Sequence, residues 1–313
     1  MDLITVGITC FNAESTIEEA VRSAQAQTWV PSEIVAVDDH STDLSWPILE
    51  RLASKDPRIR IVKHAENRGA AAARNTVLER AKGSYVAFFD DDDVSRPDRL
   101  AEQHARIIDY EREAGAKTVV CYAATQQLFP GGEIRYSPAL GMDSTPAPAG
   151  EDVARLILLG KPVGGETGIC PTASQMARRE VFELVGGFDE NFRRHEDTDF
   201  NVRLALAGGH FAGVSKPLVV QTVTATGDKA VDVERRYSFQ LIERYRDLLE
   251  GWNWYDFSRR WTGMKYAMLE GGAKSALPHL ARLFVSSPFK LARKMTWSLP
   301  HRDNYKRFRY PHE

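Results

Sequence analysis

Four consecutive carboxylates, Asp90 to Asp93, follow directly on an apolar run, Tyr85 to Phe89. The run has the composition of a buried strand, and like charges packed at its end repel one another unless a cation or hydrogen-bond donors compensate. A hard divalent cation such as Mg²⁺ is commonly held by one or two carboxylates together with substrate phosphates. The cluster therefore favours a site for a metal ion and a diphosphate. The simpler alternative is a solvated acidic loop that caps the next helix.

A second acidic pair, Asp38 and Asp39, follows a second β-rich run, Glu33 to Val37. An aspartate beside a ribose or a base can accept hydrogen bonds from it, whereas an aspartate beside phosphate needs a metal ion to avoid repulsion. The two acidic groups therefore suggest one site that binds a nucleoside at one group and a metal ion with phosphate at the other. The alternative for Asp38, Asp39 and nearby Asp43 is to form Asx turns or to cap a helix.

The elements that must position these carboxylates alternate between strands and helices over the first third of the chain. We expect strands at residues 3–11, 33–37, 58–63 and 85–89. One helix is expected to start at Ser15, with Glu18 completing a capping box, and an alanine-rich helix is expected to end before Gly83. This alternation predicts an α/β fold, a mostly parallel sheet with helices on both faces. Ligands of such sheets bind outside the carboxyl ends of the strands, where both acidic groups would lie.

Composition narrows the class of protein. With 313 residues, 43% of them hydrophobic and 27% charged, the chain can bury a full core as one large domain, alone or with an appendage. A formal net charge of -2 argues against a nucleic-acid partner. The three cysteines are far apart, so they predict neither a disulfide framework nor a zinc site and fit a reducing cytosol. Because no signal-peptide pattern or long apolar stretch is present, we expect a cytoplasmic protein that does not span a membrane.

Five motifs of this chain, in the same order, resemble those of family 2 glycosyltransferases of the GT-A fold. They are Thr5–Asn12, Val37–Asp43, Asn67–Asn75, Phe89–Pro97 and Gly186–Glu190, the last followed by Glu196 and Asp197. The resemblance covers roughly residues 1 to 225. It implies a Rossmann-like GT-A domain and an inverting transfer of a sugar from a nucleotide-diphosphate donor. A UDP-sugar is the simplest donor to expect, usually with Mn²⁺ or Mg²⁺.

The acidic cluster matches the metal and diphosphate motif of the family, the DXD motif, with Asp91 at its variable position. The resemblance implies that Asp92 and Asp93 hold the metal ion and that Asp90 and Asp91 line the nucleotide-sugar site. Many relatives add a metal-binding histidine after the strand that follows the helix of the catalytic base. This chain has Gln221, Thr222 and Thr224 there instead, which predicts a weaker or water-completed metal site.

The nucleoside is expected at the ends of the first two strands. Asp38 and Asp39 match the acidic pair of the family that binds the nucleoside, and Thr9 and Phe11 are expected beside the base. Arg68 and Arg74 follow the third strand. Either guanidinium could contact the diphosphate or hold an aspartate of the cluster. The alternative for both is an ordinary arginine on the surface of a helix.

Inversion at the sugar requires a base on the face opposite the leaving group, within hydrogen-bond reach of the acceptor hydroxyl. Asp197 is the first candidate and Glu196 the second. Both precede a helical pattern with Phe200 and Leu204 on one stripe and Gly208 at its end. A helix N-terminus keeps a carboxylate ionised, so helix capping is the alternative role for this pair.

The domain division expected from these patterns has two parts. Residues 1–228 would form the GT-A catalytic domain, with a nucleotide-sugar-binding half at 1–116 and an acceptor-binding half at 117–228. The second half would contain a hairpin at 119–128 and 133–136 and a glycine-rich substrate loop at 164–174. Residues 229–313 would form a helical extension. Its last thirty residues are basic and aromatic, which fits docking on anionic lipid or packing on the catalytic domain or another subunit.

The chain is therefore expected to be a metal-dependent inverting glycosyltransferase that acts on a glycan or lipid-linked glycan, with surface polysaccharide assembly suggested by analogy. The turn after the first strand, Gly7 to Glu14, lacks a glycine-rich loop. This absence argues against a nucleotidyltransferase and a dinucleotide-binding dehydrogenase. The remaining alternative is a catalytically inactive carbohydrate-binding or scaffold protein with the same fold, which would be indifferent to Asp197→Asn and to metal.

Overall fold

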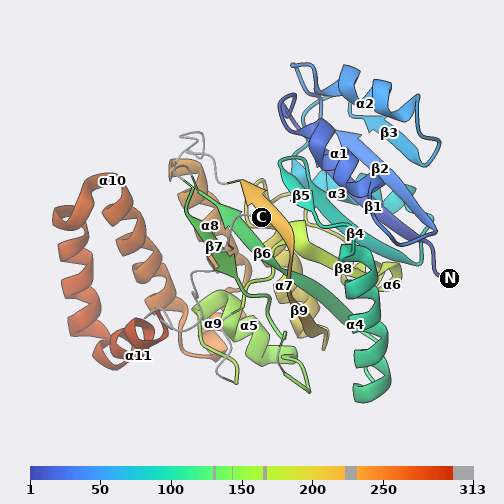
Figure 1. Cartoon of the computed structure of the whole chain (residues 1–313). Helices are drawn as coiled ribbons and strands as arrows, with labels where there is room; N and C mark the ends of the chain where they lie inside the picture. The colour runs from blue at the N-terminus through green and yellow to red at the C-terminus, as the bar shows by residue number, and fades with distance from the viewer. Residues whose placement is uncertain (130–131, 143, 165–167, 223–230, 299–313) are drawn as a thin grey trace.

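A computed structural model of the chain describes residues 1–129, 132–142, 144–164, 168–222 and 231–298 (Figure 1). Its strands form one mixed sheet in the order β3-β2-β1-β4-β8-β6-β9-β5, with β7 paired to β6. The strands are β1 Ile4–Cys10, β2 Ser32–Asp38, β3 Ile59–Lys63, β4 Tyr85–Asp90, β5 Asp93–Ser95, β6 Val119–Leu128, β7 Ile134–Ser137, β8 Gln175–Arg178 and β9 His210–Thr222.

Helices cover the sheet and continue beyond it to the end of the described chain. They are α1 Ile17–Gln25, α2 Ser45–Ala53, α3 Ala70–Arg80, α4 Arg99–Ala114, α5 Gly150–Leu159, the 3₁₀ turn η1 Thr172–Ser174, α6 Arg179–Val185, α7 Glu196–Leu206, α8 Val231–Arg244, α9 Arg246–Gly251, α10 Tyr255–Ser286 and α11 Pro288–Ser298.

The strands β1 to β4 pair in parallel, as the sequence predicts. Thr9 of β1 lies opposite Val37 of β2 and opposite Asp90 of β4. The carboxyl ends of the three strands therefore meet at one edge, which both acidic groups share. Close packing of α3 on β1 requires Gly7, because a Cβ at this position would lie 2.3 Å from Cγ1 of Val77.

The other half of the sheet is largely antiparallel. β6 and β7 form the expected hairpin. β8, which the sequence analysis did not predict, joins the two halves by pairing antiparallel with both β4 and β6. The short β5 pairs with the end of β9, where Asp93 lies opposite Gln221. The chain thus brings the end of β9 next to the acidic cluster that follows β4.

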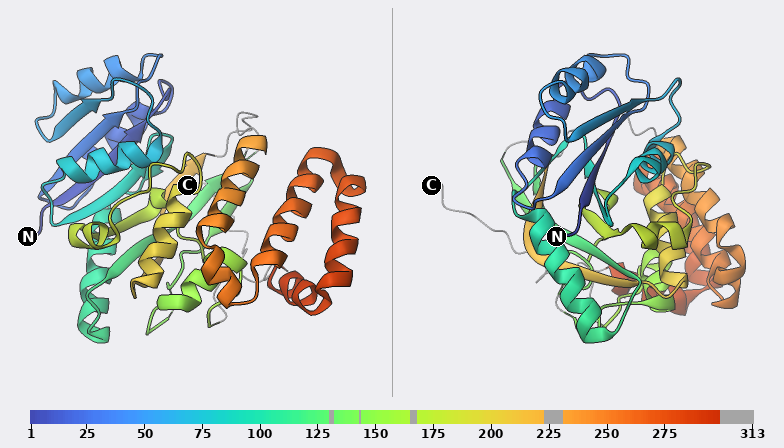
Figure 2. Two further views of the ribbon diagram at one scale, coloured as in Figure 1. Left: turned by 180° about the vertical axis from the view of Figure 1, so that it is seen from behind. Right: turned by 90° about the vertical axis from the view of Figure 1, so that its right-hand side faces the viewer.

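Alternate side chains of each strand enter two separate cores. Tyr85, Ala87 and Phe89 of β4 pack on the side of α1, α2 and α4. Val86 and Phe88 face α3, α5, α6 and α7, and the C-terminal helices add to this second core. A layer of helices on each face is the arrangement predicted from the sequence. Figure 2 shows the N-terminal strands and the C-terminal helices at opposite ends of the molecule.

The capping box predicted at Ser15 and Glu18 is wrong. Helix α1 begins at Ile17, its N-cap residue is Thr16, and no side chain caps it through a hydrogen bond. Glu18 instead accepts hydrogen bonds from the side chains of Arg22 and Arg51. Arg22 of α1 and Arg51 of α2 thus occupy the Glu18 carboxylate, and charged pairs of this kind are stronger than a bond to a backbone amide.

Several expectations fall on residues outside the described ranges. These are 165–167 of the expected substrate loop, Thr224, and 299–313, which carry much of the basic and aromatic pattern. The expected boundary at residue 228 also lies outside, so the domain division stays a prediction. None of the helices in the described ranges has both the length and the apolar character needed to cross a bilayer.

Candidate active site

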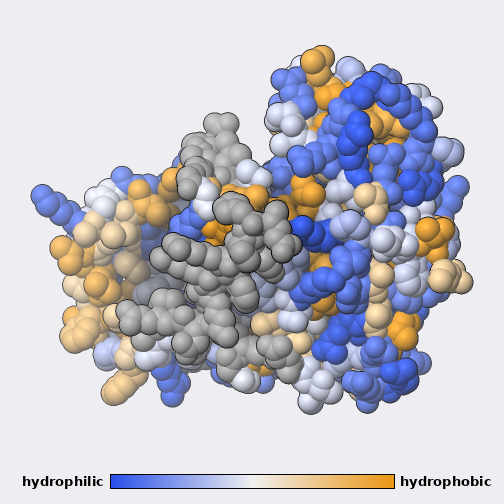
Figure 3. Space-filling view, viewed as in Figure 1, coloured by the Kyte–Doolittle hydropathy of each residue, from blue (hydrophilic) through white to orange (hydrophobic). Residues whose placement is uncertain are grey.

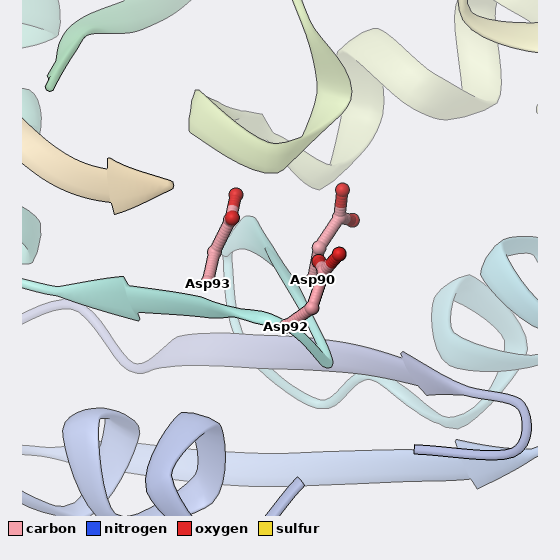
Figure 4. Close-up of side chains that lie close together, drawn as sticks. All are labelled: Asp90, Asp92 and Asp93. Carbon is pink, nitrogen blue, oxygen red and sulfur yellow. The ribbon is translucent and has the colours of Figure 1, made fainter. Parts of the chain in front are cut away.

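Asp90, Asp92 and Asp93 point to the same side of the sheet edge (Figure 4). One carboxylate oxygen of each lies within 4.8 Å of the corresponding oxygens of the other two. β4 ends at Asp90 and β5 begins at Asp93. The turn between them gathers acids that a continuous strand would split between its two faces. The resulting set of oxygens is one that a single hard divalent cation can bind.

Asp91 points elsewhere. Its Oδ2 accepts a hydrogen bond from the backbone N–H of Phe11 at 2.9 Å, which ties the acidic turn to the end of β1. The Phe11 side chain is 47% exposed, and Thr9 is partly buried. All three residues therefore lie at the edge expected for a nucleotide sugar, and their contacts with such a ligand stay predictions.

The electrostatic state of the cluster reflects its burial. Loss of hydration raises the pKa of Asp93 to about 7, and the charge of Asp90 adds to this shift. Burial likewise raises the pKa of Asp91 to about 7 and raises the pKa of Asp90, although Arg74 opposes the shift of Asp90. Carboxylates with raised pKa values lack sufficient compensating charge from the protein. A divalent cation would supply that charge, so the residues present fit the expected metal ion.

Two side chains, Gln221 and Arg99, hold the acidic turn around Asp93 in place. Gln221 of β9, one of the three residues that the sequence offers in place of the family's histidine, donates from Nε2 to Oδ2 of Asp93 at 2.9 Å. Arg99 is fully buried and donates to Oγ of Ser95 at 2.9 Å and to the carbonyl of Phe88 at 2.8 Å. Burial lowers the pKa of Arg99 to about 9. Arg99 thus fixes the end of β4 relative to β5, on either side of the acidic turn.

Arg74 links the acidic cluster to helix α7. Its Nη1 donates to Oε1 of Glu196 at 2.6 Å, and its Nη2 lies 3.7 Å from Oδ1 of Asp90. Only 7% of Arg74 is exposed, so it is not the surface arginine of the alternative interpretation. Arg68 differs, because it forms an exposed ion pair with Glu190 at 2.9 Å. A contact of either arginine with a diphosphate stays a prediction.

The two candidate bases have different surroundings, although they are neighbours in the first turn of α7. Glu196 is held by Arg74. Asp197 accepts hydrogen bonds only at Oδ1, from the N–H of Thr198 at 2.6 Å and from its hydroxyl at 3.1 Å. Within the described ranges, Oδ2 of Asp197 has no hydrogen-bond partner. Each carboxylate thus keeps one oxygen without a hydrogen-bond partner among the described residues, but only Glu196 is paired with a cation, Arg74.

The acidic pair that follows β2 is buried and used by the protein. Oδ1 of Asp39 accepts the backbone N–H of Arg68 at 2.9 Å, and Oδ2 accepts that of Gly69 at 2.6 Å. His64 adds a ring nitrogen 2.7 Å from Oδ1. Asp38 accepts the N–H of Ser41 and keeps one buried oxygen without a partner among the described residues. The structure shows that Asp39 braces the loop before α3. The expected contacts of Asp38 and Asp39 with a nucleoside stay predictions.

The sequence analysis missed two residues that position this site, His64 and Arg99. His64 bridges Asp39 and the hydroxyl of Thr76, and Arg99 supports the acidic turn. Neither lies in a motif; arginine is usually exposed, and histidine is intermediate in burial. The sequence carries no signal for their roles, because their contacts with the acidic motifs form only when strands and helices pack together.

Comparison with known families decides the classification. The sequence model of the family described as "Glycosyl transferase family 2" matches residues 5–184. The chain belongs to this family. Membership confirms the family resemblance, whose first four motifs lie within the matched range, and the enzyme class expected from it.

Named relatives of this family cover parts of the chain. The Escherichia coli "UDP-Glc:alpha-D-GlcNAc-diphosphoundecaprenol beta-1,3-glucosyltransferase WfaP" is 41% identical over 103 residues, 33% of this chain and 40% of that protein. The Bacillus subtilis "Putative teichuronic acid biosynthesis glycosyltransferase TuaG" is 45% identical over 101 residues, 32% of this chain and 40% of that protein. The matched segments thus span well under half of these two relatives. The Erwinia amylovora "Amylovoran biosynthesis glycosyltransferase AmsB" is 24% identical over 90% of this chain and 89% of its own length.

Solved structures of similar fold support the same architecture. S. aureus TarS 1-349, in complex with UDP-GlcNAc, aligns with a TM-score of 0.56 at 18% identity, over 92% of this chain and 74% of that chain. The mannosyltransferase PcManGT from Pyrobaculum calidifontis, in complex with GDP-Man and Mn²⁺, aligns with a TM-score of 0.54 at 19% identity, over 94% of this chain and 85% of that chain. The predicted GT-A fold with additional C-terminal helices is thereby confirmed.

Proposed function

We propose that this family 2 protein is a metal-dependent inverting glycosyltransferase that moves a sugar from a UDP-sugar to a glycan or lipid-linked glycan. The observation that carries the proposal is the convergence of Asp90, Asp92 and Asp93 at the strand edge that Arg74 connects to the helix of Asp197. This arrangement joins a cation site to a free carboxylate. A fold-level likeness alone would not require either feature.

The donor and the metal ion are argued from the site and from similar proteins. The three clustered carboxylates repel one another, and a bound cation would offset their charge. A diphosphate bound to that cation would avoid direct repulsion by the acids. PcManGT was solved with Mn²⁺ and a nucleotide sugar, and TarS with UDP-GlcNAc. WfaP carries a UDP-sugar in its name. These similarities favour UDP as the nucleotide and Mn²⁺ or Mg²⁺ as the metal ion, with Asp92 and Asp93 as its expected ligands.

The chemistry assigned to this chain is a single displacement. The oxygen of an acceptor hydroxyl forms a bond to the anomeric carbon while the bond from that carbon to the diphosphate oxygen breaks, and the electron pair leaves with the nucleoside diphosphate. Attack from the opposite face inverts the anomeric configuration. A bound Mn²⁺ or Mg²⁺ would stabilise the negative charge that develops on the departing diphosphate.

Asp197 is the proposed general base. Its unpartnered oxygen would accept the proton of the acceptor hydroxyl as the new bond forms. Glu196 is proposed as a positioning residue instead, since its carboxylate is bound to Arg74. Through this contact, Arg74 would hold α7 at a fixed distance from the acidic cluster. The position of the base would therefore depend on the same arginine that contacts Asp90.

The acceptor class rests on the relatives. WfaP is named for a sugar acceptor on diphosphoundecaprenol, and TuaG and AmsB for the biosynthesis of teichuronic acid and amylovoran. We therefore include a lipid-linked glycan and surface polysaccharide synthesis in the proposal. A lipid-linked acceptor implies work at a membrane surface, which agrees with the expected cytoplasmic location and peripheral membrane contact.

The proposal is tested by incubating the protein with radiolabelled UDP-glucose or UDP-GlcNAc, Mn²⁺ and a total lipid extract of the source cells. Label should enter the organic phase with the native protein and fall by about 100-fold or more with Asp197→Asn or with chelator. Asp109→Asn is the matched control, because this exposed carboxylate pairs with Arg112 alone among the residues that the structure describes. Incorporation that survives Asp197→Asn and chelation would refute the mechanism, and absence of incorporation from every donor would favour the inactive alternative.

A further inference from the structure

The C-terminal helices form a hairpin that projects from the catalytic part of the molecule (Figures 1 and 2). Helix α10 is interrupted at Gly272, whose φ of 69° and ψ of -167° are not helical. Helix α11 contacts α10, and Lys294 of α11 lies over the ring of Trp261 in the first part of α10. Only two side chains between Ala273 and Ser286, Ala276 and Leu283, are buried. The hairpin therefore has a large surface that no described part of the chain covers.

That surface is apolar. Leu277, Leu280 and Phe284 follow one another at three- and four-residue steps, so they lie on one face of α10. Val285 of α10 is 83% exposed, and Phe289 of α11 is 86% exposed. Figure 3 shows hydrophobic residues gathered on the side of the molecule where α10 and α11 lie. Isolated exposed apolar residues are common, but a contiguous group of this size marks an interaction surface.

The same hairpin is positively charged. Residues 271–298 include five lysines and arginines and no aspartate or glutamate. Lys290 and Lys294 hold α11 to the body of the molecule, because they donate to the carbonyl oxygens of Asn253 and Leu159. Lys274, Arg282 and Arg293 have no carboxylate partner among the described residues. Three cations therefore remain available beside the apolar face.

We propose that the outer hairpin face, formed by Leu277, Leu280, Phe284, Val285, Phe289 and Met295, docks on a membrane surface that contains anionic lipid. An amphipathic hairpin of this kind lies in the interface, with apolar side chains among the acyl chains and cations at the headgroups. A second copy of the chain fits less well. A two-fold contact would set the same patch against itself and bring cation against cation.

The hairpin is also connected to the proposed active site. A cavity of about 280 Å³ lies between α7 and the C-terminal helices. It is lined by His195 and Thr198, which flank the proposed base region, by Trp261 of α10 and by Lys294 of α11. The helices that carry the docking face thus also contact the N-terminal end of α7 across this cavity, and docking would bring the catalytic part of the molecule to the membrane. The docking inference rests on the proposed function, because docking serves to bring Asp197 toward a lipid-linked acceptor.

The test is co-sedimentation of the full chain with vesicles of phosphatidylcholine, with and without phosphatidylglycerol. The native protein should bind the anionic vesicles, bind pure phosphatidylcholine much more weakly, and lose binding as salt rises. Phe284→Glu combined with Phe289→Glu should weaken binding about tenfold or more, because two charges enter the apolar face. The matched control is Leu184→Glu combined with Leu206→Glu, which alters two exposed leucines of α6 and α7 and should bind as the native protein does.

Docking is overturned if the native protein ignores anionic vesicles, or if the hairpin and control variants bind equally. A native dimer that the hairpin variant converts to a monomer would overturn it in favour of a second copy. Thermal stabilisation by UDP with Mn²⁺, measured on the same samples, keeps the two proposals separate. A hairpin variant that loses vesicle binding but keeps the UDP response supports docking, and a native protein that binds vesicles without any UDP response refutes the transferase proposal alone.

Discussion

Two groups of consecutive aspartates end parallel strands at one edge of the sheet, yet the protein surrounds them differently. Asp39 is 3% exposed and accepts two backbone N–H groups and a histidine, and Asp38 is fully buried. Asp92 is exposed, and it gathers with Asp90 and Asp93 without an equivalent set of donors. In the first group, the bonds of Asp39 brace the loop before α3. The second group is the proposed cation site, and sequence spacing alone does not separate the two.

The same contrast recurs at helix α7, within one dipeptide. Glu196 is paired with a buried arginine, while Asp197 accepts, among the described residues, only from the N–H and the hydroxyl of Thr198. Carboxylates that protein donors occupy should affect stability when they are changed. Carboxylates that remain free should affect turnover. The following substitutions test this rule.

The largest expected effect is on turnover, at Asp92. Asp92→Asn should lower kcat/KM for sugar transfer by about 100-fold or more, because the metal ion loses a ligand that stabilises the leaving diphosphate. The free energy of unfolding should stay unchanged or rise, since one member of a repelling group is neutralised. Steady-state kinetics and thermal unfolding of the same preparation measure both. A variant that unfolds easily would mean that Asp92 belongs to the scaffold.

Asp39→Asn should show the opposite behaviour. The amide cannot accept from both backbone N–H groups and the histidine as the carboxylate does, so the free energy of unfolding should fall by about 2 to 4 kcal/mol. Chemical denaturation measures this change. A fully stable Asp39→Asn variant that loses UDP affinity would reverse the comparison and assign Asp39 to the ligand alone.

Glu196→Gln should have an intermediate effect. The amide oxygen can still accept from Arg74, but the negative charge that offsets this buried guanidinium is lost, so we expect a loss of about 1 to 3 kcal/mol in the free energy of unfolding. Turnover should fall less than in Asp197→Asn, because the base itself remains. Steady-state kinetics of Glu196→Gln and Asp197→Asn measure this difference. A greater loss of kcat in Glu196→Gln would make Glu196 the base and Asp197 the positioning residue.

The smallest effect on stability is expected at Arg68. Its ion pair with Glu190 is exposed on both sides, so Arg68→Ala should change the free energy of unfolding by less than about 1 kcal/mol. If Arg68 contacts the diphosphate, KM for the donor should still rise while kcat changes little. Unchanged KM and kcat would leave Arg68 as a surface arginine.

The sequence predicted those features that depend on local pattern. Alternating strands and helices, the shared edge of Thr9, Asp38 and Asp90, and a helix start near Glu196 and Asp197 all follow from the hydrophobic period and from parallel pairing. The family motifs added the assignment of roles. These predictions succeed because each rests on neighbouring residues or on a rule that applies to every parallel sheet.

The remainder depends on contacts between distant segments. The burial of Arg99 and of His64, and the pairing of Arg74 with Glu196, join residues that the sequence keeps apart. The four-residue strand β8 is too short for a periodic signal and forms only between β4 and β6. The capping box at Ser15 failed because Arg51 of the neighbouring helix competes for Glu18. Tertiary partners decided each of these outcomes.

The central claim is that the free acidic cluster holds a divalent cation together with a nucleoside diphosphate. The most direct measurement is the shift in unfolding temperature caused by UDP, with Mn²⁺ or with chelator, for the native protein and Asp92→Asn. Ligand at about a hundred times its dissociation constant stabilises by about 2.7 kcal/mol, which gives a visible shift. The account predicts stabilisation of the native protein by UDP only with Mn²⁺, and loss of that shift in Asp92→Asn. Equal shifts with chelator, or in the variant, would contradict it.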